Sequence, residues 1–341
     1  MATLVCTMLD ERKTAILQAV VEDYIQTAQP VGSSHIAKAP GVNVSPATVR
    51  SEMAALEQAG YLHQPHTSAG RIPTEKGYRS FVDSMIGEGK SPGKLARGQA
   101  AAVREFFDQA HGELEAMLSD TSRLLSGLTN YAAVVVAPGV DAAAIRSVQL
   151  VDLAPQVVMV VAVLANGVIE KHTIELATEV SAEVVADAGR AVADAFVGQT
   201  LGSPVSVESR ALGTDELIDA AIGALSGHES NDIVFVDGRD RVAQSFEAVE
   251  QVRHVLTVLE RQLVVVSLLR DVLDRGLQIA IGNETGVETL ADCALVVAPY
   301  EIGGETAGTI GVLGPTRMDY SQALAAVAVV SNQLGHRLTE G

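Results

Sequence analysis

The side chains with the clearest chemistry in this sequence are small polar residues and one arginine, spaced helically between residues 45 and 54. Ser45-Pro46 is typical of a helix start, because serine can cap the first turn and proline needs no hydrogen-bond partner there. Spacings of four and three place Val49, Met53 and Leu56 on one buried face. The opposite face is expected to carry Ala47, Thr48, Arg50, Ser51 and Ala54. A helix with so thin an outer face can enter the major groove of DNA, where arginine pairs with guanine and serine or threonine reaches bases or phosphates.

Two neighbouring segments would position this reading helix, which is expected to begin at Pro46 and to end at Gly60, on the duplex. A shorter helix is expected from Ser33 to Lys38, with Ser33 or Ser34 as its cap and a free N-terminus that suits a phosphate. Residues 39–43 form the turn between the two helices. After Gly60 ends the reading helix, a short strand, a polar loop and a returning strand predict a wing. The wing side chains expected to reach sugar and phosphate are Thr67, Ser68 and Arg71.

Further helices are expected at residues 10–27 and 74–86, which would complete a winged helix-turn-helix domain. Two roles stay open within it. Arg50 either reads a base or clamps a phosphate, and His66 in the wing either donates to a phosphate or holds the loop through a local hydrogen bond. Many helix-turn-helix folds contact only proteins, so a scaffold that does not bind DNA is also compatible with these residues.

Acidic residues dominate the chain but not its first quarter. Of the 24 basic and 42 acidic residues, 7 and 8 lie in residues 1–86, so the formal charge of −18 resides almost wholly in the remainder. Binding would therefore depend on helix dipoles and on a few positioned cations, namely Arg50, Arg71, Lys76 and Arg79. An acidic body would repel random DNA and raise the dependence on a specific site.

Several other classes of function find no support in the sequence. Cys6 and Cys293 stand far apart, so we expect neither a disulfide framework nor a metal site. No nucleophile elbow, zinc-protease motif or carboxylate pair is recognisable. The glycine-rich run 303–308 lacks the ending of a phosphate loop and precedes a strand, so we expect a hairpin turn there. We expect a protein that is not an enzyme, needs no cofactor, spans no membrane and resides in a reduced cytoplasm.

Beyond residue 93 the pattern predicts alternating helical and strand segments. Residues 94–130 read as one long helix with a heptad-like seam, which either packs on the next domain or is shared between two subunits. Apolar runs at residues 131–137, 145–153 and 157–164, followed by the Asn166-Gly167 turn, predict one antiparallel sheet. An alanine-rich block at 180–243 reads as an insertion. Then follow a long helix (245–273) with Leu263 on its apolar face and strands at 278–281, 293–299 and 309–313. A final helix (319–338) is expected to bury Tyr320, Leu324, Val327, Ser331, Leu334 and Leu338.

Six motifs along the chain carry a resemblance to a known family. They are Glu22-Asp23-Tyr24-Ile25, Pro30-Val31-Gly32-Ser33, Ser45-Pro46-Ala47-Thr48-Val49-Arg50, Pro65-His66-Thr67-Ser68-Ala69-Gly70-Arg71-Ile72-Pro73-Thr74, Gly77-Tyr78-Arg79 and Gly314-Pro315-Thr316-Arg317-Met318-Asp319-Tyr320. Together they resemble the HrcA family, the heat-inducible transcription repressors of bacterial chaperone operons. The resemblance runs from about Asp10 to Leu338 and differs in one place, because members often carry Asn-Asp where this chain has Ser51-Glu52. The role of Arg317 in the last motif stays open between docking the winged domain and pairing with Asp319.

The resemblance implies an α+β multidomain protein in which a GAF-like antiparallel domain is interrupted by an inserted α/β dimerisation domain. It further implies a homodimer on double-stranded DNA, at the CIRCE inverted repeat upstream of chaperonin and DnaK operons, kept active by the chaperonin GroEL. The alternative is a one-component regulator that senses a small molecule through its GAF-like domain. The expected divisions are a winged helix-turn-helix domain (1–88), a linker with the long helix (89–130), a first GAF-like segment (131–179), the insertion (180–244) and a second GAF-like segment (245–341).

Overall fold

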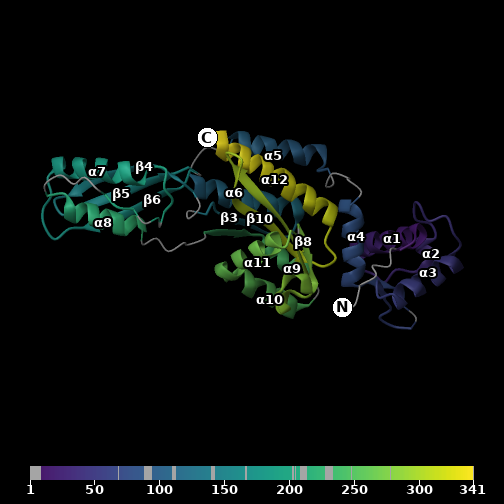
Figure 1. The fold of residues 1–341 in the computed structure, drawn as a ribbon. Coiled ribbons are helices and arrows are strands. Elements are labelled where there is room, and N and C mark those ends of the chain that lie inside the picture. Colours follow the sequence, from purple (N-terminus) through teal and green to yellow (C-terminus); the bar gives the residue numbers. More distant parts are fainter. Residues whose placement is uncertain are drawn as a thin grey trace, which may run out of the picture.

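A computed structural model describes most of the chain. The described residues are 9–67, 69–87, 94–109, 113–139, 143–165, 167–201, 203, 205–207, 213–226, 233–246, 248–276 and 278–340. They form a mixed α/β structure with antiparallel sheets, arranged as three regions along one line (Figure 1). A central body lies between an N-terminal helical domain and a small α/β insert. The predicted linker residues 88–93 lie outside the described residues.

The N-terminal domain has the order of elements that the sequence predicts. Its core contains the buried face of the reading helix together with Ile16, Leu17, Val20 and Val21 of the first helix. Asp10 caps that first helix through a hydrogen bond from the Lys13 N–H (2.8 Å). The elements are α1 (Glu11–Thr27), α2 (Ser33–Ile36), α3 (Pro46–Gln58), β1 (Leu62–His63), β2 (Ile72–Pro73) and α4 (Glu75–Gly87).

The body is built on a five-stranded antiparallel sheet in the order β7-β3-β10-β9-β8. Because successive side chains alternate between faces, one face packs against α5, α6 and α12 while the other packs against α9, α10 and α11. The β9–β10 hairpin turns at Gly303-Gly304, both with positive φ, which confirms the expected hairpin turn. The strands are β3 (Ala132–Val136), β7 (Val234–Asp237), β8 (Ile279–Ile281), β9 (Cys293–Ile302) and β10 (Glu305–Pro315).

The prediction of one sheet over residues 131–177 is wrong. β3 is buried along its whole length and pairs with β10 and β7, whereas β4, β5 and β6 form a separate three-stranded sheet. Burial alternates along β5 because only one face of that sheet is covered, by α7 and α8. The insert thus groups β4 (Ile145–Ala154), β5 (Val157–Leu164) and β6 (Ile169–Glu175) with α7 (Ala182–Phe196) and α8 (Asp215–Ser226), while β7 returns to the body.

Two predicted long helices are interrupted. Residues 94–130 form α5 (Arg97–Gln109) and α6 (Leu114–Thr129), with extended backbone at Glu113, and both pack against α12. Residues 245–273 divide among the end of α9 (Arg239–Ser245), α10 (Val249–Leu259) and α11 (Gln262–Asp274), because Phe246 and Arg261 leave helical geometry. That break rotates the buried stripe, so Leu263 is 74% exposed although its spacing predicted burial.

The final helix, α12 (Tyr320–Glu340), confirms its predicted position and face. Tyr320, Leu324, Val327 and Leu334 are all buried against the sheet. α12 crosses the body from the end that meets the N-terminal domain towards α5 (Figure 1). None of the described helices has the length and apolarity that a bilayer crossing requires.

Candidate nucleic-acid interface

The start of α3 has the geometry that its sequence predicts. Ser45 has extended backbone, and its Oγ accepts a hydrogen bond from the Thr48 N–H (3.2 Å) while Pro46 begins the helix. Ser45 Oγ also lies 2.9 Å from Thr48 Oγ1. Val49 and Met53 below are at most 1% exposed, so the helix is fixed from its inner face.

The outer face of α3 is open to solvent. Ala47, Arg50 and Ser51 are exposed, and Thr48 is half-buried. No ion pair found among the described residues involves Arg50. Its two acidic neighbours on the helix are occupied elsewhere. Glu52 lies 3.2 Å from Arg12 Nε of α1, and Glu57 pairs with a wing arginine. The outer face of α3 therefore presents the Arg50 guanidinium among small side chains, which suits entry into the major groove.

The short helix α2 is four residues long, shorter than the six predicted. Its N-cap is Gly32, and neither Ser33 nor Ser34 makes a side-chain capping bond. Ser34 is exposed and Ser33 is half-buried, so both hydroxyls lie at the helix start as the sequence predicts. An ion-pair contact between His35 Nε2 and Asp23 Oδ1 (2.8 Å) fastens α2 to α1.

The predicted wing is a pair of two-residue strands with a polar loop. His66 and Thr67 are exposed at its tip, and Ser68 lies outside the described residues. The loop is held by Gln64, whose Nε2 donates to the Thr67 carbonyl (3.2 Å) and the Ala69 carbonyl (2.9 Å). Sequence reasoning missed Gln64, although a glutamine at the foot of a polar loop is a signal for such bracing.

Arg71 is a brace between the wing and the reading helix. Its Nε and Nη2 both lie 3.0 Å from Glu57 Oε2, and its side chain is only 13% exposed. Its backbone exchanges two 2.9 Å hydrogen bonds with Val31, just before α2. A side chain at Gly70 would collide with the Val31 carbonyl oxygen, so the wing approaches α2 without a gap.

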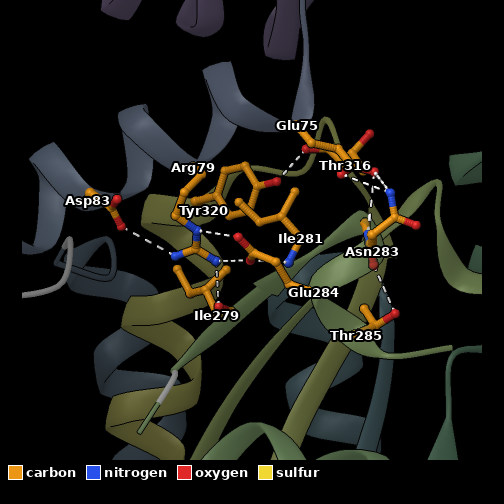
Figure 2. A network of polar contacts seen from close by, with 11 residues as sticks. Glu75, Arg79, Asp83, Ile279, Ile281, Asn283, Glu284, Thr285, Thr316 and Tyr320 are labelled. Carbon is orange, nitrogen blue, oxygen red and sulfur yellow. Dashed lines mark hydrogen bonds and ion pairs between the residues drawn. The ribbon is translucent and has the colours of Figure 1, made fainter. Parts of the chain in front are cut away.

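Arg79 lies against the body (Figure 2), on α4, which stands between the body and the helices α1, α2 and α3 (Figure 1). Its Nε donates to Glu284 Oε1 (2.9 Å) and its Nη2 donates to the Ile279 carbonyl (2.8 Å). Nη2 also pairs with Glu284 Oε2. Burial alone lowers the pKa of Arg79, but the hydrogen bonds and charge of Glu284 outweigh it and hold the pKa above its ordinary value. No local pattern could find this partner, which stands 205 residues later.

The motif at residues 314–320 belongs to the same contact. Tyr320 packs against Tyr78 of α4 with ring centroids 6.1 Å apart, and both are buried. Burial raises the pKa of both phenols. The Asp319 N–H donates to the Tyr131 hydroxyl (3.0 Å), and Arg317 Nη2 reaches the Ser245 carbonyl at the end of α9 (3.4 Å). The motif thus shapes the joint between the body and α4.

Chemistry other than binding has little support in these residues. Within the described residues of the chain, no group of three or more histidine, cysteine or acidic side chains could hold a metal ion. Cys293 is buried in β9, and burial raises the pKa of its thiol to about 12, so it is a poor nucleophile.

Comparisons with known proteins find similar sequences along almost the whole chain. A family model described as the HrcA protein C terminal domain matches residues 115–324. The heat-inducible transcription repressor HrcA of Nocardioides sp. is 35% identical over 342 residues, covering 98% of this chain and 100% of the relative. That of Thermobifida fusca is 36% identical over 342 residues and covers 97% of each chain. A crystal structure described as a hypothetical protein is 21% identical, covers 98% of this chain and 99% of the other, and has a TM-score of 0.66, which shows a shared fold.

Proposed function

The chain belongs to the HrcA family of heat-inducible transcription repressors, and from that premise we propose how it represses. Its N-terminal domain is a winged helix-turn-helix, and the five-stranded body is GAF-like. Two copies bind the CIRCE inverted repeat upstream of chaperonin and DnaK operons and block their transcription. The two-fold symmetry of the dimer matches that of the operator, so each reading helix occupies one half-site.

The observation that carries this proposal is the outer face of α3. Arg50 stands exposed there, while the two acidic residues on the helix are paired with cations of α1 and the wing. Arg50 reads a base, and the neighbouring small polar side chains contact bases and sugar-phosphate. These are Ser45, Ala47, Thr48 and Ser51 on α3, Ser33 and Ser34 on α2, and His66, Thr67 and Ser68 in the wing.

Two arginines have different roles in this proposal. Arg71 is paired with Glu57, so it holds the wing at a fixed angle to the reading helix. It contacts DNA only through the edge of its guanidinium group. Arg79 faces the body and affects DNA binding by orienting the N-terminal domain relative to the body. The N-terminal domain is close to neutral, so its nonspecific attraction to phosphate is weak. Its binding therefore depends largely on the sequence-specific contact of Arg50.

Fluorescence anisotropy on a labelled inverted-repeat duplex tests the proposal. Wild type is expected to prefer the repeat over a scrambled duplex, and Arg50→Ala to remove roughly 1–3 kcal/mol of that preference. Arg123→Ala, which deletes an exposed arginine on α6 of the body, is the matched control and should bind as wild type. Equal binding of wild type to both duplexes, with chaperonin present, would refute the proposal.

The proposed regulation depends on the chaperonin GroEL. The chaperonin keeps the repressor competent, and heat-unfolded protein draws it away so that the genes are expressed. The proposal draws on the many valine and alanine side chains in the cores, since regions with few buried apolar contacts open at low free energy. Repeating the titration after cycles of unfolding and refolding checks this point. Full recovery of operator affinity without chaperonin would contradict the dependence.

A second candidate function rests on one cleft in the body. The cleft has a volume of about 470 Å³ and lies between α11 and the ends of β3 and β10. Apolar residues such as Leu269 and Leu273 line it, with Arg270 and Asp274 among its polar residues. Such a site suits a small molecule, and the protein would then be a one-component regulator. A specific thermal shift with a small-molecule library, together with a change in operator affinity, would favour this function.

A further inference from the structure

Helix α4 is fastened firmly to the end of the reading helix. Lys76 Nζ donates to the carbonyl oxygen of Ala59, the residue that ends α3, at 2.9 Å. Thr74 Oγ1 donates to the Gly60 carbonyl at 2.7 Å. A side chain at Gly77 would collide with the Tyr61 carbonyl oxygen, so the helix lies directly on this backbone. These contacts hold the start of α4 against the end of α3.

Other side chains of α4 are fastened to the body. Arg79 holds Glu284 and the Ile279 carbonyl, as described above, and Glu75 accepts two 3.1 Å hydrogen bonds from Asn283 Nδ2 (Figure 2). Glu75 and Arg79 are four residues apart and therefore lie on one stripe of the helix. A side chain at Gly282 would collide with the Glu75 carboxylate, so the two surfaces touch closely here.

Apolar packing joins the N-terminal domain to the body as well. One continuous buried cluster runs from α1 and α3 through Tyr78 and Val82 of α4 into Tyr320 and Ile281 of the body. The polar contacts lie at its edge, where Arg79 and Glu284 keep 22% and 35% of their side-chain surface exposed. Apolar packing holds the domain and the body together without strong directional preference, whereas the bidentate ion pair fixes the angle between them.

We propose that α4 is a lever that transmits the orientation of the body to the reading helix, with the contact of Arg79 and Glu75 on residues 279–284 as its anchor. This rests on the proposed function, in which the two reading helices of the dimer must fit half-sites at a fixed spacing along the duplex. An N-terminal domain that rotates with α4 relative to the body still binds one half-site. The spacing between the two reading helices of the dimer is then no longer fixed. Release of the anchor is thus a route by which changes in the body switch the repressor off.

Operator spacing provides the first test. Wild type, Arg79→Ala and the control Asp83→Asn are titrated against the inverted repeat, a repeat lengthened by half a helical turn, and a single half-site. Asp83 contacts the same guanidinium at 3.4 Å but is 63% exposed, so its removal should have little effect. Arg79→Ala is expected to weaken binding to the repeat by about tenfold and to leave the half-site affinity unchanged.

Two results of that titration would overturn the lever. One is an Arg79→Ala protein that keeps the wild-type affinity and spacing preference. The other is an equal loss on the half-site, since it would mean that the N-terminal domain itself was damaged. A combined Arg79→Ala and Glu284→Gln variant should be no weaker than Arg79→Ala alone, because both changes remove the same ion pair. Glu284→Gln keeps a carbonyl oxygen that can still accept the Ile281 N–H, which donates to Glu284 Oε2 at 3.0 Å.

A distance measurement decides the same question without DNA. Spin labels at Gln58→Cys on α3 and Arg253→Cys on α10, in protein lacking Cys6 and Cys293 and diluted with unlabelled chains, report the angle between domain and body. A distance distribution that broadens in Arg79→Ala but not in Asp83→Asn supports the lever, and an unchanged distribution overturns it. If wild type shows no preference for the repeat, the proposed function fails while this distance still decides the lever.

Discussion

The N-terminal domain presents two surfaces that contrast in almost every respect. Its outer surface, on α3 and the wing, is polar and solvent-exposed, and Arg50 stands there without an ion-pair partner among the described residues. Its inner surface, on α4, is half-buried, and Arg79 there is bound by a carboxylate and a carbonyl oxygen. The outer surface leaves the Arg50 guanidinium open to a partner, whereas the Arg79 guanidinium of the inner surface is already bound.

The contrast teaches that an arginine cannot be assigned to DNA by its domain alone. Arg50, Arg71 and Arg79 all lie within thirty residues in the domain that we propose binds DNA, yet one is open, one braces the wing and one contacts the body. A guanidinium that already has a bidentate carboxylate must lose that partner before it can bind phosphate. The arginines that are candidates to read bases are therefore those whose guanidinium is not already bound by a carboxylate.

The largest expected effect comes from the inner surface. Tyr78→Ala would leave a cavity between α4 and α12 and is expected to destabilise the N-terminal domain by about 3–5 kcal/mol. Tyr78→Phe should be neutral or stabilising by up to about 1 kcal/mol, because the hydroxyl is buried with no hydrogen-bond partner among the described residues. Calorimetric unfolding measures both. A strongly destabilised Tyr78→Phe would show that the hydroxyl does have a partner.

The next effect belongs to the outer surface and separates binding from folding. Arg50→Lys keeps the charge but loses the planar fork, so it should lose about 1–3 kcal/mol of preference for the operator while nonspecific binding persists. Its free energy of unfolding should stay within about 0.5 kcal/mol of wild type, because the side chain is exposed. Paired binding and unfolding titrations check this. Full specificity in Arg50→Lys would mean that Arg50 clamps a phosphate.

A smaller effect compares two helix caps. Ser45→Ala and Asp10→Ala each remove a side-chain cap, from α3 and α1, and each should destabilise the domain by about 1 kcal/mol. Only Ser45→Ala should also weaken operator binding beyond the effect on stability, since Ser45 lies at the exposed start of the reading helix. Denaturant melts and anisotropy titrations on both variants make the comparison. Equal binding losses would assign Ser45 a purely structural role.

The smallest expected effect concerns the body. In protein with Cys6→Ser, alkylation of Cys293 at pH 8 should be slow, because the thiol is buried and its pKa is raised to about 12. The folded state keeps this proton longer than the unfolded state does, so stability should fall as pH rises above about 9. Mass spectrometry over time measures the alkylation rate. A rapid reaction in native conditions would show that β9 opens readily.

Local sequence determined the elements of the N-terminal domain. The Ser45-Pro46 start, the buried positions Val49, Met53 and Leu56, the Asp10 cap and the two-residue strands are all where the sequence predicts them. These features depend on contacts between residues that are close in the sequence, so the local sequence predicts them. The same is true of the β9–β10 turn and the buried face of α12. The wing brace by Gln64 was also readable locally but was missed.

Only the tertiary structure decided which strands pair and which arginines remain free. β3 leaves its sequence neighbours to pair with β10 and β7, because a strand buried on both faces needs partners that the adjacent hairpin cannot supply. Arg79 finds Glu284 across 205 residues, and Tyr78 finds Tyr320 across still more. Helical spacing specifies which face of a segment is apolar, but it carries no information about what covers that face. The local sequence therefore determined the surface of α3 and the wing. The contact of Glu75 and Arg79 with residues 279–284 exists only because the tertiary fold brings these distant segments together.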